Sequence, residues 1–324
     1  MATMNTDRTP QDDLRGAVVF TLLVLSAGWL VMAPLWFLVD GQPVYMSDAD
    51  AGGSDTGFAL LLQVFPSVMM LTPALAAWVT MRWVHGIRFR TMLTDLGLGT
   101  AAGTRRHPFV SLLLWSVLAI AGTIGLVIAS VAVAALLGFL PLDWSIPALA
   151  PAAEATGIPV GLLLALQLVS VPVAAVVPNA FFAAGEEIGW RGYLLPRLRR
   201  LWGTPVAVIV SGIVWGAWHA PIILLGYNFS RPHIGGVLLM IAGCVAVGAW
   251  FSWLALTSRT IWPAIVGHGA LNASAAFYLL VSGDPQVDGA LAGPLGVAGW
   301  IAFGVVGTVL LVVFRRKRRA ADQV

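Results

Sequence analysis

The chain has 324 residues, of which 59% are hydrophobic and only 10% are charged, with a formal net charge of +3. A soluble domain of this length carries roughly 25% charged residues, and the mean hydropathy here is +0.88. The composition therefore excludes a large soluble domain and predicts an all-α, polytopic membrane protein. The pI of 9.5 does not indicate a nucleic-acid partner, because the basic residues flank apolar runs, where membrane orientation explains them.

Eight apolar runs each have about the 20 residues that a helix needs to cross a bilayer. We therefore expect about eight transmembrane helices in a single transmembrane domain over residues 16–314. A cytoplasmic N-terminal segment (1–15) precedes this domain, and a basic cytoplasmic tail (315–324) follows it. The runs cover residues 16–39, 57–84, 109–140, 162–195, 205–226, 234–256, 262–282 and 291–314.

The positions of the arginines predict the orientation. Nearly all of them fall at the two ends of the chain and in the 82–106, 197–200 and 257–261 segments, whereas the opposite loops hold only Arg231. Because cytoplasmic loops carry the excess of Lys and Arg, an even number of spans with both termini cytoplasmic satisfies every loop. We expect a multi-pass protein of the cell membrane, in contact with lipid. The single lysine beside many Arg and Ala residues is typical of a bacterial chain.

Residues 185–192, Gly-Glu-Glu-Ile-Gly-Trp-Arg-Gly, place two carboxylates and an arginine inside an apolar run. Ionisable side chains in a membrane segment are costly, so they are usually paired and often functional. Glu187 and Arg191 are four residues apart, which predicts an ion pair on one helix face. Glu186 points about 100° away from that face and is left free for another task. A purely structural ion pair is the simpler interpretation of Glu187 and Arg191.

Two further polar sites follow, His219 at the end of the 215–219 stretch and His268 four residues before Asn272. At about 1.5 Å per helical residue, Glu186 and these side chains all lie roughly 14–23 Å from the nearest cytoplasmic arginine. Each histidine alone could be an interhelical hydrogen bond. Three separate helices bring polar groups to the same depth, however, and this indicates one buried polar site.

Two chemistries suit these residue types. In the first, Glu186 is a general base that takes a proton from water, while His268 and Asn272 stabilise an oxyanion. In the second, His219 and His268, with or without Glu186, hold a divalent metal such as zinc, which activates the water. Neither a His-Glu-x-x-His helix nor a Gly-x-Ser-x-Gly elbow occurs in the sequence, so it does not fit those metalloproteases and serine hydrolases.

In order and spacing, these motifs resemble those of the CPBP family of intramembrane metalloproteases, which includes type II CAAX prenyl endopeptidases and bacteriocin-processing proteins. The matching residues are Glu186, Glu187 and Arg191 in Glu-Glu-x-x-x-Arg, His219 in Phe-x-x-x-His, and His268 and Asn272 in His-x-x-x-Asn. Trp215 stands where the second motif has Phe, and we expect this change to alter packing and to leave the chemistry in place. The resemblance places the protease core at about residues 160–282.

The resemblance implies hydrolysis of a peptide bond within the membrane, in a peptide or membrane-protein substrate. It implies that Glu186 and His219 activate the water and that His268 and Asn272 stabilise the oxyanion. The Glu187–Arg191 pair would hold the site together. The family is usually called metal-dependent, which implies a divalent metal. Bacteria generally lack prenylated CAAX proteins, so the resemblance does not imply a prenylated substrate here.

Two alternatives stay open. A proton-coupled transporter would use the buried Glu and His residues as a relay, although the sequence shows neither an inverted repeat nor paired broken helices. A non-catalytic membrane scaffold derived from the protease would keep its function after Glu186→Ala, whereas the enzyme would lose it.

Overall fold

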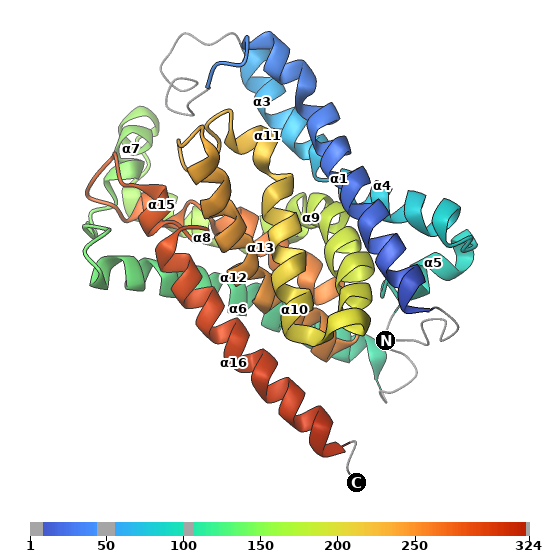
Figure 1. The fold of residues 1–324 in the computed structure, drawn as a ribbon. Coiled ribbons are helices and arrows are strands. Elements are labelled where there is room, and N and C mark those ends of the chain that lie inside the picture. The colour runs from blue at the N-terminus through green and yellow to red at the C-terminus, as the bar shows by residue number, and fades with distance from the viewer. Residues whose placement is uncertain (1–8, 44–55, 100–106, 322–324) are drawn as a thin grey trace.

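The computed structural model describes residues 9–43, 56–99 and 107–321. These residues form a bundle of helices and contain no strand (Figure 1). Within a bilayer every backbone N–H and C=O must be paired inside its own segment, and a helix is the only element that does this for a single apolar run. The all-α, polytopic class expected from the composition is therefore confirmed.

The first half of the described chain is built from long helices joined by short ones. Its elements are α1 (Pro10–Leu38), α3 (Thr56–Met69), α4 (Thr72–Val79), the π-helix η1 (Thr80–Val84), α5 (Phe89–Asp95), α6 (Pro108–Leu136), the 3-10 helix η2 (Pro147–Leu149) and α7 (Ala150–Thr156).

The second half of the described chain carries all three motifs. Its elements are α8 (Val160–Val176), α9 (Asn179–Glu187), the π-helix η3 (Ile188–Leu194), α10 (Leu195–Trp218), α11 (Ala220–Ile223), α12 (Ile234–Ser258), α13 (Trp262–Ser274), α14 (Phe277–Leu280), α15 (Gly289–Ala292) and α16 (Val297–Ala321).

The expected count of eight spans is not confirmed. Within the described residues six helices are long and apolar enough to cross a membrane, or seven if the bent pair α7 and α8 is one span. One of the six is a 40-residue helix, Asn179–Trp218, in which Gly203 leaves the helical conformation at φ 76° and ψ 172°. Two expected spans therefore meet at this turn. The run 262–282 forms the 13-residue α13 and the short α14, so neither helix alone has the length of a span.

The expected run 162–195 is also interrupted. α8 ends at Val176, a cis peptide bond joins Val177 to Pro178, and α9 begins at Asn179. Both α8 and α9 pack against α13. After this break, α9, which carries Glu186 and Glu187, begins next to α13, which carries His268.

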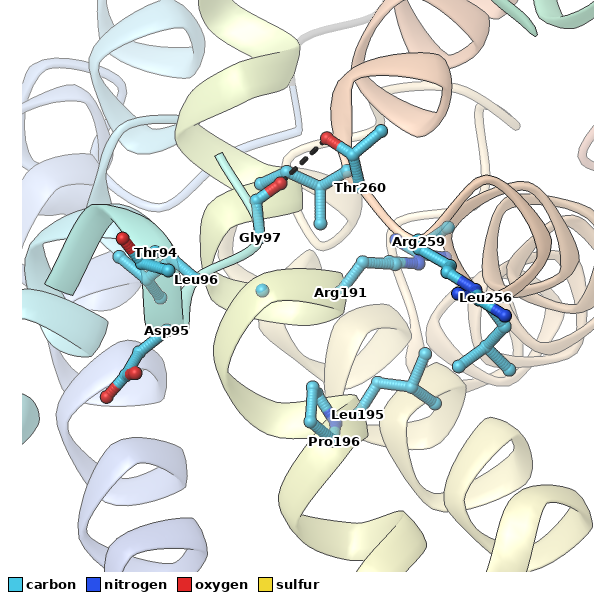
Figure 2. Close-up of a pocket in the computed structure, with 13 residues that line it drawn as sticks. Thr94, Asp95, Leu96, Gly97, Arg191, Leu195, Pro196, Leu256, Arg259 and Thr260 are labelled. Atoms are coloured by element: carbon cyan, nitrogen blue, oxygen red, sulfur yellow. Dashed lines mark hydrogen bonds between the residues drawn. The ribbon is translucent and has the colours of Figure 1, made fainter. Parts of the chain in front are cut away.

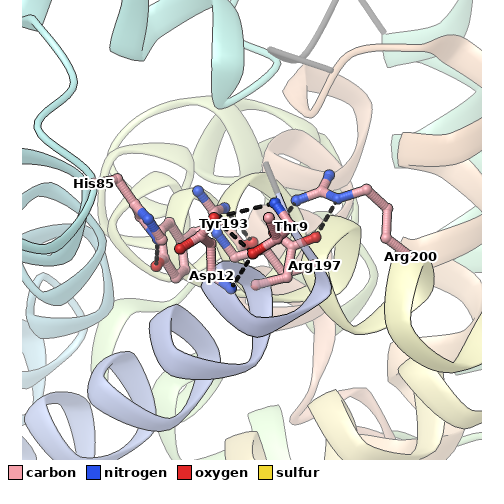
Figure 3. A network of polar contacts seen from close by, with 7 residues as sticks. Thr9, Asp12, His85, Tyr193, Arg197 and Arg200 are labelled. Atoms are coloured by element: carbon pink, nitrogen blue, oxygen red, sulfur yellow. Dashed lines mark hydrogen bonds and ion pairs between the residues drawn. The ribbon is translucent and has the colours of Figure 1, made fainter. Parts of the chain in front are cut away.

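A polar network ties α1 to the motif helix at the arginine-rich end of the bundle (Figure 3). The guanidinium group of Arg200 donates two hydrogen bonds of 2.5 Å to the buried carboxylate of Asp13. The Nε2 atom of His85 lies 2.9 Å from the hydroxyl oxygen of Tyr193. α1 begins at Pro10, inside the segment 1–15 that the sequence assigned to a separate N-terminal part.

The centre of the bundle depends on a close approach between α10 and α12. Gly212 and Gly216 face the α12 backbone, where an added Cβ would lie 2.6 Å from Cα of Val245 and 2.3 Å from Cα of Ile241. Small residues four apart let helix backbones approach closely in membrane proteins. Trp215 lies on α10 and His219 directly follows it, so this contact sets their position relative to α12.

We expect Gly216→Ala to lower the free energy of unfolding by about 1–3 kcal/mol, because the new methyl group overpacks a backbone contact. The thermal unfolding midpoint of the detergent-solubilised protein should fall accordingly. The matched control is Gly125→Ala in α6, where an added Cβ meets no atom within 4 Å. This control should leave the midpoint unchanged or raise it slightly, because Ala favours a helix more than Gly does. Equal midpoints for the two variants would contradict the close approach.

Candidate active site

Glu186 is the penultimate residue of α9, just before the π-helix η3. Its side chain is buried, with 2% of the residue exposed. The Oε2 atom accepts one hydrogen bond from the indole N–H of Trp190 at 3.2 Å and a second from that of Trp215 at 2.6 Å. Helical spacing had left Glu186 without a partner, and the structure corrects this by giving one of its two oxygens two donors.

Glu187 is fully buried and forms the ion pair that the sequence predicts. Its Oε1 atom accepts a hydrogen bond from Arg191 at 2.8 Å and lies 2.9 Å from Nδ1 of His268. The carboxylate thus joins η3 to α13. Its Oε2 atom has no hydrogen-bond partner among the described residues. The expected Glu187–Arg191 pair is confirmed. The contact between His268 and Glu187 was not predicted from the sequence.

His219 follows the last residue of α10 and is half-buried. Its Nδ1 atom lies 2.9 Å from the backbone carbonyl oxygen of Trp215. Because a carbonyl oxygen only accepts, Nδ1 carries the proton, and in the neutral ring Nε2 keeps its lone pair. Glu186 and His268 are near enough to His219 to interact with it electrostatically. The structure thus brings together groups from all three motifs.

Aromatic rings enclose the charged groups. The guanidinium carbon of Arg191 lies 4.4 Å from the centroid of the Trp215 ring and 5.4 Å from that of Phe251. The imidazole of His268 stacks on Phe251 at 5.4 Å and meets Trp215 edge-on at the same distance. Phe251 and Trp190 were not among the site residues predicted from the sequence. Trp190 could have been found from its i, i+4 spacing to Glu186, whereas no local signal marks Phe251.

Asn272 lies one turn after His268 on α13, but its side chain is exposed. No hydrogen bond links it to another described residue. The structure therefore does not place Asn272 in polar contact with the buried groups, and its expected part in the site stays a prediction.

A divalent metal held by Glu186, His219 and His268 stays a prediction. Within the described ranges no three His, Cys, Asp or Glu side chains are grouped closely enough to hold a metal ion. Nδ1 of His268 contacts Glu187, Nδ1 of His219 contacts a carbonyl oxygen, and one oxygen of Glu186 accepts from two indoles. A histidine that binds zinc commonly directs its other ring nitrogen to such an oxygen. The spacing of the described groups nevertheless does not fit a three-ligand zinc site, and we derive no step through a metal.

A small pocket lies beside Arg191, the cation of the ion pair (Figure 2). Arg191 lines it and at the same time binds Glu187. The pocket opens beside Arg259, in a loop that the arginine pattern predicts to be cytoplasmic. It is lined by Thr94, Asp95, Leu96, Gly97, Arg191, Gly192, Leu195, Pro196, Ala255, Leu256, Arg259, Thr260 and Ile261.

Comparison with known proteins gives two matches. Residues 162–274 match the family described as Rce1-like, type II CAAX prenyl endopeptidase. Over 95 residues the chain is 32% identical to a protein named CAAX prenyl protease 2 from Methanococcus maripaludis, which covers 28% of this chain and 35% of the relative. The matched part thus spans about a third of the relative's length. The family match includes all three motifs, which confirms the resemblance over this segment.

We expect Arg191→Met to destabilise the protein by about 3–5 kcal/mol, because it leaves the buried carboxylate of Glu187 without its cation. The control is Arg231→Met, which breaks an ion pair with Asp288 whose side chains are 40% and 34% exposed. An exposed pair contributes less than about 1 kcal/mol. Unfolding midpoints in detergent measure both effects, and an equal loss in the two variants would contradict the assigned burial.

Proposed function

We propose that this chain, whose residues 162–274 form a region of the type II CAAX prenyl endopeptidase family, is an intramembrane endopeptidase. The observation that carries the proposal is the gathering of Glu186, His219 and the Glu187–His268 contact from three helices inside an apolar bundle. A buried carboxylate with one oxygen left for water, in a site that also holds an imidazole with a lone pair, suits general-base activation of water.

In the proposed reaction Glu186 removes a proton from a water molecule that His219 helps to orient. The hydroxide oxygen forms a bond to the carbonyl carbon of the scissile peptide, and the carbonyl oxygen becomes an oxyanion. The C–N bond then breaks, and Glu186 passes its proton to the leaving amine. Because the indoles of Trp190 and Trp215 occupy Oε2, Oε1 is the atom assigned to the water.

The oxyanion would be stabilised from α13. In its doubly protonated form, His268 keeps Nδ1–H on Glu187 and presents Nε2–H to the developing charge, as preorganised donors do in acyl transfer. Asn272 would add a second donor once the substrate covers its exposed side chain. Arg191 would hold Glu187, and through Glu187 it would hold the ring of His268.

The protein is a multi-pass membrane protein, and its substrate is proposed to be a peptide or a membrane-associated protein segment. We place it in the cell membrane with both termini cytoplasmic, from the arginine pattern. The pocket lined by Arg191 and Arg259 would then lie on the cytoplasmic side of the ion pair. The match to an endopeptidase family does not favour the transporter interpretation.

Glu186→Gln is expected to abolish cleavage, because the amide keeps the shape of the side chain and cannot take the proton. Membrane-protein termini would be compared by mass spectrometry between cells that carry the wild type and cells that carry Glu186→Gln at matched abundance. Glu154→Gln, an exposed substitution in α7, is the control and should cleave like wild type. Identical sets of termini in cells with wild type and with Glu186→Gln would contradict the proposal.

Exhaustive dialysis of the purified protein against a chelator is expected to leave cleavage intact, because the described donors do not form a three-ligand site. Turnover of a peptide identified from the cellular termini is the measurement. Loss of turnover that is restored by zinc alone would support the metal-bound alternative.

A further inference from the structure

Trp215 contacts four of the charged or titratable groups of the site. Its indole N–H donates to Glu186 at 2.6 Å, and its ring lies under Arg191 at 4.4 Å and beside His268 at 5.4 Å. Its backbone carbonyl oxygen accepts from His219 at 2.9 Å. One residue thus links the groups supplied by all three motifs.

These contacts separate into those that any aromatic residue would make and one that requires an indole. Phenylalanine at position 215 would keep the backbone carbonyl and a ring, but it has no N–H. The N–H contact is also the shortest polar contact to Glu186. Hydrogen bonds to an ionised acceptor are shorter and stronger than neutral ones, and this one is buried, since Trp215 is 3% exposed.

The two indole donors reach the same carboxylate oxygen. Trp190 approaches Oε2 of Glu186 from one turn further along its own chain segment, and Trp215 approaches it from α10. A carboxylate held at one oxygen by two donors cannot rotate freely, so its two oxygens become inequivalent. Oε2 is fixed to the protein, and Oε1 is the oxygen available to another molecule.

We propose that Trp215 is a positioning residue, whose indole N–H fixes Glu186 so that Oε1 faces the water that attacks the peptide. The inference rests on the proposed function. It goes beyond that function by assigning a role to the N–H group that the phenylalanine of the related motif lacks. From the sequence, we expected the tryptophan at this position to change packing only.

The first test is Trp215→Phe in the full-length protein. We expect kcat to fall about 10- to 100-fold with KM unchanged, since a misplaced base slows the chemical step and the substrate still binds. Trp190→Phe should have a smaller effect, because its contact is longer. The control is Trp250→Phe, which removes an indole hydrogen bond of 2.9 Å to Thr123, and neither of these two residues belongs to the proposed site.

The second test needs no turnover. Thermal unfolding midpoints would be measured for Trp215→Phe, Glu186→Ala and the double variant. Residues that share a hydrogen bond are not additive, so the double variant should lose less than the sum of the two single losses. The same cycle with Trp250→Phe and Glu186→Ala should be additive.

The two tests separate the possible failures. A kcat for Trp215→Phe within twofold of wild type would overturn the positioning role, and so would additive losses in the stability cycle. A raised KM with an unchanged kcat would also overturn it, because that pattern belongs to substrate binding. If the wild type cleaves nothing while the cycle is non-additive, the proposed protease function fails and the contact between Trp215 and Glu186 is supported.

Discussion

A carboxylate buried among apolar helices has no water to solvate it, and the arrangement around Glu187 follows from that constraint. Its charge is balanced by Arg191 on the same chain segment and by contact with His268 on α13. Removing a charge from water costs several kcal/mol unless good partners replace the water. The same contacts hold η3 against α13, so pairing the charge also brings the first and third motifs of the site together.

The backbone around this carboxylate is correspondingly irregular. The interruption between α8 and α9, the π-helix η3 and the turn at Gly203 all fall within the stretch that carries or flanks the first motif. π-helical turns change which side chains share a face and are frequent at functional sites. A regular helix across this stretch would present a different set of side chains to α13. The close approach of α10 to α12 at Gly216 then positions the second motif.

Much of this arrangement is predictable from spacing. A separation of four residues predicted the pair of Glu187 with Arg191, and equal distances from cytoplasmic arginines predicted one site from three helices. The count of eight spans depended on each apolar run forming one straight crossing helix, and α13 is too short for that. Trp215 was identified by its motif, but its N–H contact with Glu186 depends on the rotation of α10 relative to α9. That rotation cannot be predicted from a single sequence.

Indoles suit this environment for a physical reason. A tryptophan has a large apolar surface that packs among helices, together with a single N–H that must find an acceptor when it is buried. Trp190 and Trp215 therefore hold Glu186 without bringing a second cation into the apolar interior. Arg191 supplies the compensating charge one residue away, on Glu187. Adjacent carboxylates are thus treated differently, since one is paired with a cation and the other, the proposed general base, is held by neutral donors.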